Sequence, residues 1–336
     1  MSSPIAFANR RVLVGGGCGF FGSYLVPALV AAGARVRVVD NLAGGDSASL
    51  SSVADSIEFV RGDLRDPRVC DETMPGQEVF VNFAATASGV GFSRAHHSEM
   101  LIDNLLCGIV PLQAAQRHGI PRVVITSTSC VYPDDAPVPT PELDAFLGAP
   151  EQVNEGYGWA KRMQELAAGY LARERGMRTT ILRPFNLYGA NYPWRSLERA
   201  HVIPSLVKRL LDGEDPLVVW GSGEQRRNFL HGTDAAEVVL RVIASGADGP
   251  VNIGYEDDIR IADLVSLVCD VTGRHPRIVF DRSRPDGQAR KASDSTRLRA
   301  LTGDYTPRVT LRQGIEEMVG WYARTFPAGA ASSRER

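Results

Sequence analysis

Short apolar runs recur along the first half of the chain, and segments with helical spacing of apolar positions separate them. The runs lie at residues 11–15, 34–41, 57–63, 79–85, 123–125 and 178–183. Near-continuous apolar runs of this length are typical of parallel strands that are buried on both faces. Helical segments are expected at residues 23–33, at 100–118 and through Lys161 to about Arg175. This alternation predicts an α/β fold with a doubly wound parallel sheet.

The composition changes after Pro184, where Pro, Trp, Arg and Gly become denser. We interpret residues 185–227 and 255–325 as a smaller C-terminal lobe that binds substrate. Residues 1–184 are expected to form the sheet domain, to which the chain returns at about residues 228–254. The small and polar residues 326–336 are expected to form a flexible tail.

The bulk composition excludes several classes of partner. The chain has 336 residues, 44% of them hydrophobic, with a formal net charge of −2. This balance gives no reason to expect a nucleic acid or a membrane surface as partner. The apolar runs are also shorter than a membrane span requires.

The cysteines and the N-terminus bear on the compartment. The five cysteines are scattered and form no C-x-x-C pair, which argues against a disulfide framework and a metal site. The first residues lack the pattern of a signal peptide. We therefore expect a cytoplasmic protein without a bound metal.

A glycine-rich turn follows the first apolar run and precedes the first helix. Gly16, Gly19 and Gly22 have the spacing at which a backbone can approach a pyrophosphate and a helix can pack closely on a strand. Asp40 ends the next strand, where a carboxylate can bind ribose hydroxyls and repel a 2′-phosphate. The pattern predicts a dinucleotide site and favours NAD over NADP.

Other residues of the turn and of the strand ends complete the expected cofactor site. Asp63 ends the third strand and is expected near the adenine, and the small Ala84 and Ala85 end the fourth strand. The remaining expected contacts are Phe20, Phe21, Asn41 and Leu64.

A hydroxyl- and thiol-bearing segment follows the strand at residues 123–125. Thr128 and Cys130 stand there, at the strand end where ligands gather in open parallel sheets. Tyr157 and Lys161 follow at a spacing of four, so they share one face of a helix. A lysine ammonium beside a phenol favours the phenolate, and the pair is therefore a candidate proton acceptor.

Together these motifs resemble the extended short-chain dehydrogenase/reductase family, over roughly residues 11–325. The resemblance implies a Rossmann sheet, NAD as cofactor, and catalysis by Thr128, Tyr157 and Lys161. It further implies that Tyr157 and Thr128 act on a sugar C4 hydroxyl, and that Lys161 binds the nicotinamide ribose and lowers the tyrosine's pKa. Relatives commonly form homodimers, so a homodimer is expected.

Cys130 distinguishes between branches of this family. The segment Ser-Cys-Val-Tyr-Pro at residues 129–133 is similar to GDP-mannose 3,5-epimerases and GDP-L-fucose synthases. In those branches the cysteine is one of two acid–base groups at C3 and C5. The second group of the fucose synthases is the histidine of a His-Val-Ile-Pro segment, which here begins at His201. The resemblance implies that a Cys130 thiolate removes a proton and that His201 delivers one.

The substrate-binding residues are inferred from the same resemblance. Arg227 is expected to bind the diphosphate, because guanidinium suits that anion. The other expected substrate contacts are Gly91, Ser129, Asn186, Arg209 and Arg290.

The branch resemblance implies a GDP-mannose-type 3,5-epimerase that oxidises C4 transiently and then re-reduces it. Three alternatives stay open. One is a fucose synthase-like epimerase/reductase that acts on a GDP-4-keto-6-deoxyhexose. Another is a UDP-sugar 4-epimerase in which Cys130 is passive. The last is a non-catalytic NAD-sensing protein on the same fold. The sequence leaves the nucleotide, the inverted centres and the pathway undetermined.

Overall fold

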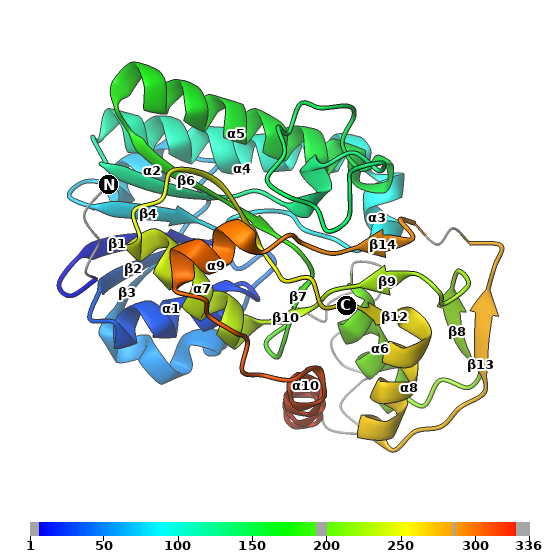
Figure 1. Ribbon diagram of the computed structural model, residues 1–336. Helices are drawn as coiled ribbons and strands as arrows, with labels where there is room; N and C mark the ends of the chain where they lie inside the picture. Colours follow the sequence, from blue (N-terminus) through cyan, green and yellow to red (C-terminus); the bar gives the residue numbers. More distant parts are fainter. Residues whose placement is uncertain (1–6, 193–199, 285–286, 327–336) are drawn as a thin grey trace.

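The protein is organised around a seven-stranded parallel sheet (Figure 1), in a computed structural model that describes residues 7–192, 200–284 and 287–326. The strand order is β11-β6-β5-β4-β1-β2-β3. The strands are β1 (Arg11–Gly15), β2 (Arg35–Asp40), β3 (Ile57–Arg61), β4 (Val79–Asn82), β5 (Arg122–Thr126), β6 (Arg178–Pro184) and β11 (Gly249–Ile253). The order reverses between β1 and β4, which is where doubly wound sheets bind ligands. The predicted fold class is confirmed.

Helices cover both faces of the sheet. One face carries α1 (Gly22–Ala31), α7 (Gly232–Ala244) and α9 (Thr296–Thr302), and the other carries α2 (Pro67–Thr73), α4 (His97–Arg117) and α5 (Glu155–Arg175). Gly176, with a φ of 67°, ends α5 in the left-handed conformation that glycine adopts at helix ends. A 3₁₀ segment, η1 (Ser47–Ser56), precedes β3.

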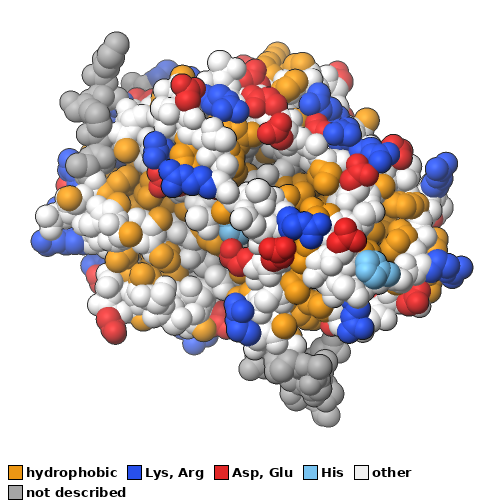
Figure 2. Space-filling model, turned by 60° about the horizontal axis from the view of Figure 1, so that its bottom comes forward, with side chains coloured by type: hydrophobic (Ala, Val, Ile, Leu, Met, Phe, Trp, Pro, Cys, Tyr) orange, Lys and Arg blue, Asp and Glu red, His pale blue; other side chains and the backbone are white. Residues whose placement is uncertain are grey.

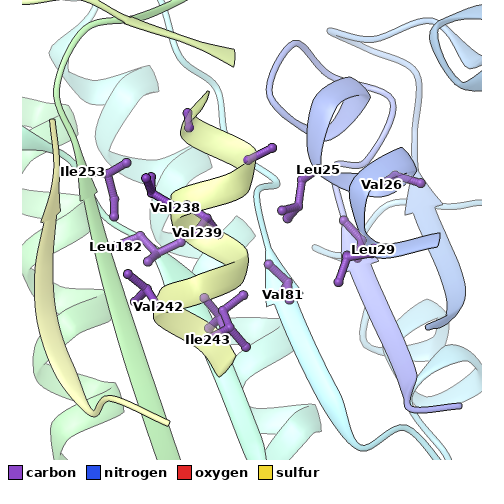
Figure 3. Close-up of a cluster of buried hydrophobic side chains, with 14 of the residues drawn as sticks. Leu25, Val26, Leu29, Val81, Leu182, Val238, Val239, Val242, Ile243 and Ile253 are labelled. Carbon is purple, nitrogen blue, oxygen red and sulfur yellow. The ribbon is translucent and has the colours of Figure 1, made fainter. Parts of the chain in front are cut away.

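Alternation along the strands explains why both faces are apolar. Val12 and Val14 of β1 pack into the cluster under α1 and α7, whereas Leu13 between them packs into the cluster under α4 and α5. Successive side chains of a strand point to opposite faces, so a strand buried on both must be apolar throughout. Figure 3 shows Val238 and Val242 of α7 among the side chains of the first cluster.

The smaller lobe has its own apolar core. Its helices are α6 (Val202–Leu211), α8 (Ile261–Thr272) and α10 (Leu311–Thr325), and β8 (Leu217–Trp220) pairs with β13 (Ile278–Asp281). Short ribbons join the lobes: β7 (Leu187–Tyr188) with β10 (Leu230–His231), and β9 (Arg226–Arg227) between β12 (Ile259–Arg260) and β14 (Arg290–Lys291). This lobe lies beside the sheet domain in Figure 1.

The structure differs from the sequence-based description in two places. The helix α3 (Val90–Ala95) lies between the predicted strand at residues 79–85 and the predicted helix at residues 100–118, and it is too short to show apolar periodicity. The expected lobe boundary placed residues 255–325 entirely in the smaller lobe. Instead Leu298 of α9 and Tyr305 pack with α7 in the core of the sheet domain. The part of the expected tail at residues 327–336 lies outside the described residues.

Two surface properties bear on partners. In the described part of the chain, none of the helices is long and apolar enough to cross a membrane. Figure 2 shows a face on which Lys and Arg side chains are interspersed with Asp and Glu.

Candidate functional site

The glycine-rich turn lies at the carboxyl end of β1, against the end of β4. Gly16 has a φ of +70°, and a Cβ there would lie 2.7 Å from the backbone nitrogen of Ala84. Only glycine therefore fits, and the turn brings Gly16 beside the predicted Ala84. The Gly19 amide donates to the Gly16 carbonyl at 3.2 Å, and α1 begins at Gly22.

Asp40 is joined to the same turn. Its carboxylate is 7% exposed and accepts hydrogen bonds from the Cys18 amide at 2.9 Å and the Leu42 amide at 2.8 Å. The amide of the turn thus fixes the carboxylate at the point where β2 ends. A negative charge in this position attracts hydroxyl donors and disfavours a phosphate.

The other predicted cofactor residues surround this edge. Asn41 donates to Asp63 at 3.0 Å, and Asp63 also binds Arg65 at 2.8 Å. Hydrogen bonds from Arg65 lower the pKa of Asp63 to about 2, so its carboxylate is ionised. Leu64 points into the sheet core, where its side chain packs close to Gly15. Among the remaining predicted contacts, Phe20 packs edge-to-face against Tyr24 and at a tilt against Tyr192. Phe21 packs edge-to-face against Phe83, and Ala85 is exposed.

Tyr157 and Lys161 lie on the first two turns of α5, as their spacing predicts. The Lys161 ammonium is 5.6 Å from the centre of the Tyr157 ring, and its side chain is 2% exposed. It donates to Gln164 Oε1 at 3.4 Å, a long hydrogen bond for a buried cation. Burial lowers the pKa of Lys161 to about 8. A ligand hydroxyl beside this ammonium would supply the close hydrogen-bond partner that a buried cation requires.

These features test whether the site suits a dinucleotide. The turn offers bare backbone where a Cβ would clash, Asp40 offers a carboxylate for ribose hydroxyls, and Lys161 is a buried and weakly partnered cation. Each property matches one part of NAD: the pyrophosphate, the adenosine ribose and the second ribose.

Thr128 and Cys130 lie at the end of β5, in the extended turn that begins the 3₁₀ segment η2 (Ser129–Val131). The Thr128 hydroxyl accepts a hydrogen bond from the Cys130 amide at 3.1 Å. The fully buried Arg162 of α5 donates to the Val131 carbonyl at 2.9 Å and to the Gly148 carbonyl at 2.6 Å. This clamp ties the turn with Cys130 to the helix with Tyr157.

The expected phenolate is not what the structure shows. Burial raises the pKa of Tyr157 well above its ordinary value, and the neighbouring Cys130 adds to the rise. Lys161 does not offset this rise: its ammonium lies over the face of the ring, 5.6 Å from the ring centre, rather than beside the hydroxyl. The phenol is therefore protonated in the protein alone.

Cys130 lies against a buried ion pair that the motifs did not reveal. The Lys291 ammonium of β14 is 3.7 Å from the Cys130 sulfur and 3.0 Å from Glu151 Oε2. Glu151 stands just before the 3₁₀ segment η3 (Gln152–Asn154), and Asn154 donates to the same Oε2 at 2.9 Å. Lys291 and Glu151 are 9% and 6% exposed. A thiol, an ammonium and a carboxylate thus meet at the end of β5.

Burial and the charges of this cluster disfavour the expected thiolate. Burial and the Glu151 charge raise the pKa of Cys130 to about 12, although Lys291 opposes them. Burial alone would raise the pKa of Glu151, but Lys291 and hydrogen bonds from Cys130 and Asn154 lower it to about 2. At neutral pH the cluster holds a thiol beside a charged ion pair.

His201 precedes α6 and completes the set of predicted catalytic residues. Its backbone amide donates to the Tyr192 hydroxyl at 3.1 Å, and its ring packs against that of Tyr192. Its imidazole keeps accessible surface, yet neighbouring atoms desolvate it and lower its pKa, with a further contribution from Lys291. The imidazole is therefore neutral at pH 7.

The predicted substrate residues are three uncharged residues and three arginines. Ser129 adjoins Cys130, and Gly91 lies on α3. Asn186 donates to the Asn228 carbonyl at 3.0 Å. The arginines already have protein partners: Arg227 donates to the Gln288 carbonyl at 2.7 Å, Arg209 pairs with Glu214, and Arg290 pairs with Asp258. Their contacts with substrate stay predictions.

Two site residues, Glu151 and Lys291, were missed. Lys291 closes the arginine-rich segment at residues 284–291, in which the sequence analysis selected its neighbour Arg290. Strand β14 pairs Lys291 with Arg227 of β9, and this register directs it to Cys130. Glu151 belongs to no motif, so only the folded chain reveals it.

Comparisons with known proteins agree with this geometry. Residues 12–254 match the NAD dependent epimerase/dehydratase family. GDP-L-fucose synthase 1 of Arabidopsis thaliana is 32% identical over 247 residues, which cover 72% of this chain and 75% of that protein.

Two solved structures share the fold over nearly the whole chain. UDP-glucose 4-epimerase of Thermotoga maritima, solved with UDP-glucose, has a TM-score of 0.82 at 27% identity and covers 94% of this chain and 99% of its own. The dTDP-glucose 4,6-dehydratase of Streptomyces venezuelae, solved with NAD, has a TM-score of 0.81 at 30% identity, with coverages of 94% and 97%. The chain is therefore an enzyme of the NAD-dependent epimerase/dehydratase family, with NAD as its cofactor.

Proposed function

We propose that this enzyme epimerises a GDP-activated hexose of the mannose type at C3 and C5, through transient oxidation at C4. The observation that carries the proposal is the position of Cys130. Its sulfur lies 3.7 Å from the Lys291 ammonium, and the charge of the same ammonium helps to lower the pKa of His201. An acid–base pair next to the oxidising group is what inversion beside a ketone requires.

The chemistry needs a way to acidify carbon-bound hydrogens. NAD, when bound, accepts a hydride from an alcohol carbon and can return it. The C4 hydroxyl proton would pass to Tyr157 in its phenolate form, which the positive charges of Lys161 and of bound NAD would favour. Tyr157, then a phenol again, and Thr128 would hydrogen-bond the C4 oxygen, both as a ketone and as the enolate that forms when a neighbouring hydrogen leaves. Lys161 would bind the ribose next to Tyr157.

The protonation states of Cys130 and His201 suggest their roles. Cys130 is a thiol and His201 a neutral imidazole at pH 7. We therefore assign Cys130 as the proton donor on one face of the sugar and His201 as the acceptor on the other. This reverses the roles expected from the sequence, because burial beside Glu151 keeps the thiol protonated.

The preference for a GDP-sugar is supported by the relatives. The Arabidopsis protein is named a GDP-L-fucose synthase, and the segment from Ser129 to Pro133 resembles that branch. Arg227 is the residue we assign to the diphosphate.

A second candidate is a fucose synthase-like epimerase/reductase, which is favoured by the relatives and by His201. It would consume a reduced cofactor in each turnover. The Asp40 carboxylate disfavours NADPH and so supports the redox-neutral reaction. A 4-epimerase, like the structural neighbour from Thermotoga maritima, would leave Cys130 without a role.

The test is turnover with a matched set of sugar nucleotides. Purified enzyme with catalytic NAD is incubated with GDP-mannose, UDP-glucose or dTDP-glucose, and the products are resolved by chromatography and NMR. We expect C3 or C5 epimers of the GDP-sugar with no net change in absorbance at 340 nm. Stoichiometric consumption of NADPH on a GDP-4-keto-6-deoxyhexose would replace the proposal with the second candidate.

The assembly and the location are also proposals. Ile102 and Leu106 of α4 and Tyr170 of α5 are exposed at 56%, 44% and 47%, and the two helices lie side by side (Figure 1). We propose that this surface joins two copies in a homodimer. All five cysteines are free thiols, which supports a cytoplasmic location.

A further inference from the structure

The buried ion pair of Lys291 and Glu151 contacts Cys130 through both side-chain and backbone groups. Lys291 donates to Glu151 Oε2 at 3.0 Å while its ammonium stays 3.7 Å from the Cys130 sulfur. The Glu151 amide in turn donates to the Cys130 carbonyl at 3.1 Å. The carboxylate and the thiol therefore belong to one backbone-linked unit, and Lys291 reaches it from β14.

Among the described residues, few other charged groups act on the thiol or on its ion pair. The groups that influence Cys130 or its ion pair are Thr128 of the same turn, Tyr157 of α5, His201 before α6 and Arg227 of β9. Tyr157 and His201 are neutral at pH 7, and Arg227 acts on Lys291. The charge balance at the sulfur is consequently set by Lys291 and Glu151.

We propose that Glu151 is a positioning residue, which holds the Lys291 ammonium beside the Cys130 sulfur and keeps Cys130 in the thiol form that donates a proton. The catalytic part of this inference rests on the proposed epimerase function. Lys291 alone would stabilise a thiolate, because an opposite charge favours the ionised form of its neighbour. The carboxylate neutralises that effect and adds a repulsion of its own.

This arrangement predicts opposite effects for the two partners. Replacing Glu151 with Gln removes the repulsion and leaves Lys291 unopposed, so the thiolate becomes easier to form. Replacing Lys291 with Met removes the attraction and leaves a carboxylate beside the sulfur, so the thiolate becomes harder to form. A purely structural ion pair would give no such opposition, since either substitution would loosen the same loop.

The test measures the reactivity of Cys130 without any sugar substrate. The full-length enzyme is treated with iodoacetamide between pH 6 and 10, and alkylation of each cysteine is followed by peptide mass spectrometry. Below the thiol's pKa the reactive thiolate fraction changes about tenfold per pKa unit. We expect Glu151→Gln to accelerate alkylation of Cys130 at pH 7.5 at least about tenfold, and Lys291→Met to slow it.

Matched variants separate charge from folding. Glu155→Gln removes an exposed carboxylate at the start of α5 and should leave the Cys130 profile unchanged. Lys291→Arg keeps the positive charge, so its rate of Cys130 alkylation should stay near that of the unsubstituted enzyme at each pH. If Glu151→Gln does not fold, the comparison of Lys291→Arg with Lys291→Met tests the charge effect instead. Unchanged reactivity in Glu151→Gln, or acceleration in both Glu151→Gln and Lys291→Met, would overturn the proposal. Because no sugar is present, these outcomes are independent of the epimerase assignment.

Discussion

Lys161 is predicted to destabilise the NAD-free enzyme, and replacing it with Met should reveal the cost. Burial lowers the pKa of Lys161 from 10.5 to about 8. This shift of about 2.5 pKa units corresponds to roughly 3 kcal/mol of lost stability when the ammonium is charged. Because the folded state disfavours the charged form, the penalty is absent above pH 10.5, grows as the pH falls towards 8, and is complete below that value.

The prediction concerns the free energy of unfolding of the NAD-free protein. Lys161→Met should be more stable than the unsubstituted enzyme by roughly 2–3 kcal/mol at pH 7. The difference should shrink as the pH rises through 8 and vanish near 10.5. Urea denaturation followed by tryptophan fluorescence at pH 6.5, 8 and 9.5 measures it. The same variant should lose turnover, since Lys161 is the proposed partner of the ribose.

A matched lysine controls for the loss of any ammonium. Lys208 of α6 pairs with Asp212 at 2.6 Å, and these contacts raise its pKa even though partial burial opposes them. Lys208→Met should therefore lower stability by less than about 1 kcal/mol, the opposite sign. If Lys161→Met is no more stable than the unsubstituted enzyme at pH 7, and the difference does not change with pH, the burial argument is refuted.

Three further predictions concern other parts of the molecule. Asp40→Asn should raise the affinity for NADP relative to NAD by roughly tenfold, because it removes the repulsive charge and keeps the shape; an unchanged ratio in fluorescence titrations would contradict the ribose assignment. Leu106→Glu should produce monomers in light scattering, whereas Phe59→Glu, at an exposed position on β3, should leave the assembly intact. Arg183→Met should cost about 3–5 kcal/mol in urea denaturation, because it leaves the Glu165 carboxylate unpaired in the core, where the pair is 3% and 7% exposed. A loss below 1 kcal/mol would mean that Glu165 gains solvent or another partner.

Local patterns predict NAD as the cofactor and the residues that we expect to bind it. The glycine spacing, Asp40 at a strand end and the four-residue step from Tyr157 to Lys161 each depend on a short stretch of chain. In the structure the glycine-rich turn and Asp40 are joined by the hydrogen bond that the Cys18 amide donates to the Asp40 carboxylate. Such features follow from backbone geometry, which a sequence pattern can encode.

The environment of Cys130 was not predictable in the same way. Lys291 reaches the sulfur from 161 residues further along the chain, through the pairing of β14 with β9. Glu151 carries no motif, and its effect on the thiol depends on burial, which the sequence does not specify. The sequence pattern predicts ionised side chains for Cys130 and Tyr157 because it does not specify burial. In the structure, burial keeps both side chains neutral.

The measurement that tests the central claim most directly is hydrogen exchange into the sugar. The enzyme, with catalytic NAD, is incubated with GDP-mannose in D2O, and the nucleotide sugar is analysed by mass spectrometry and NMR. The account predicts deuterium at C3 or C5 without accumulation of NADH, and loss of the epimerised product in Cys130→Ser while NAD binding persists. Product that carries no solvent deuterium, or full epimerisation by Cys130→Ser, would contradict it.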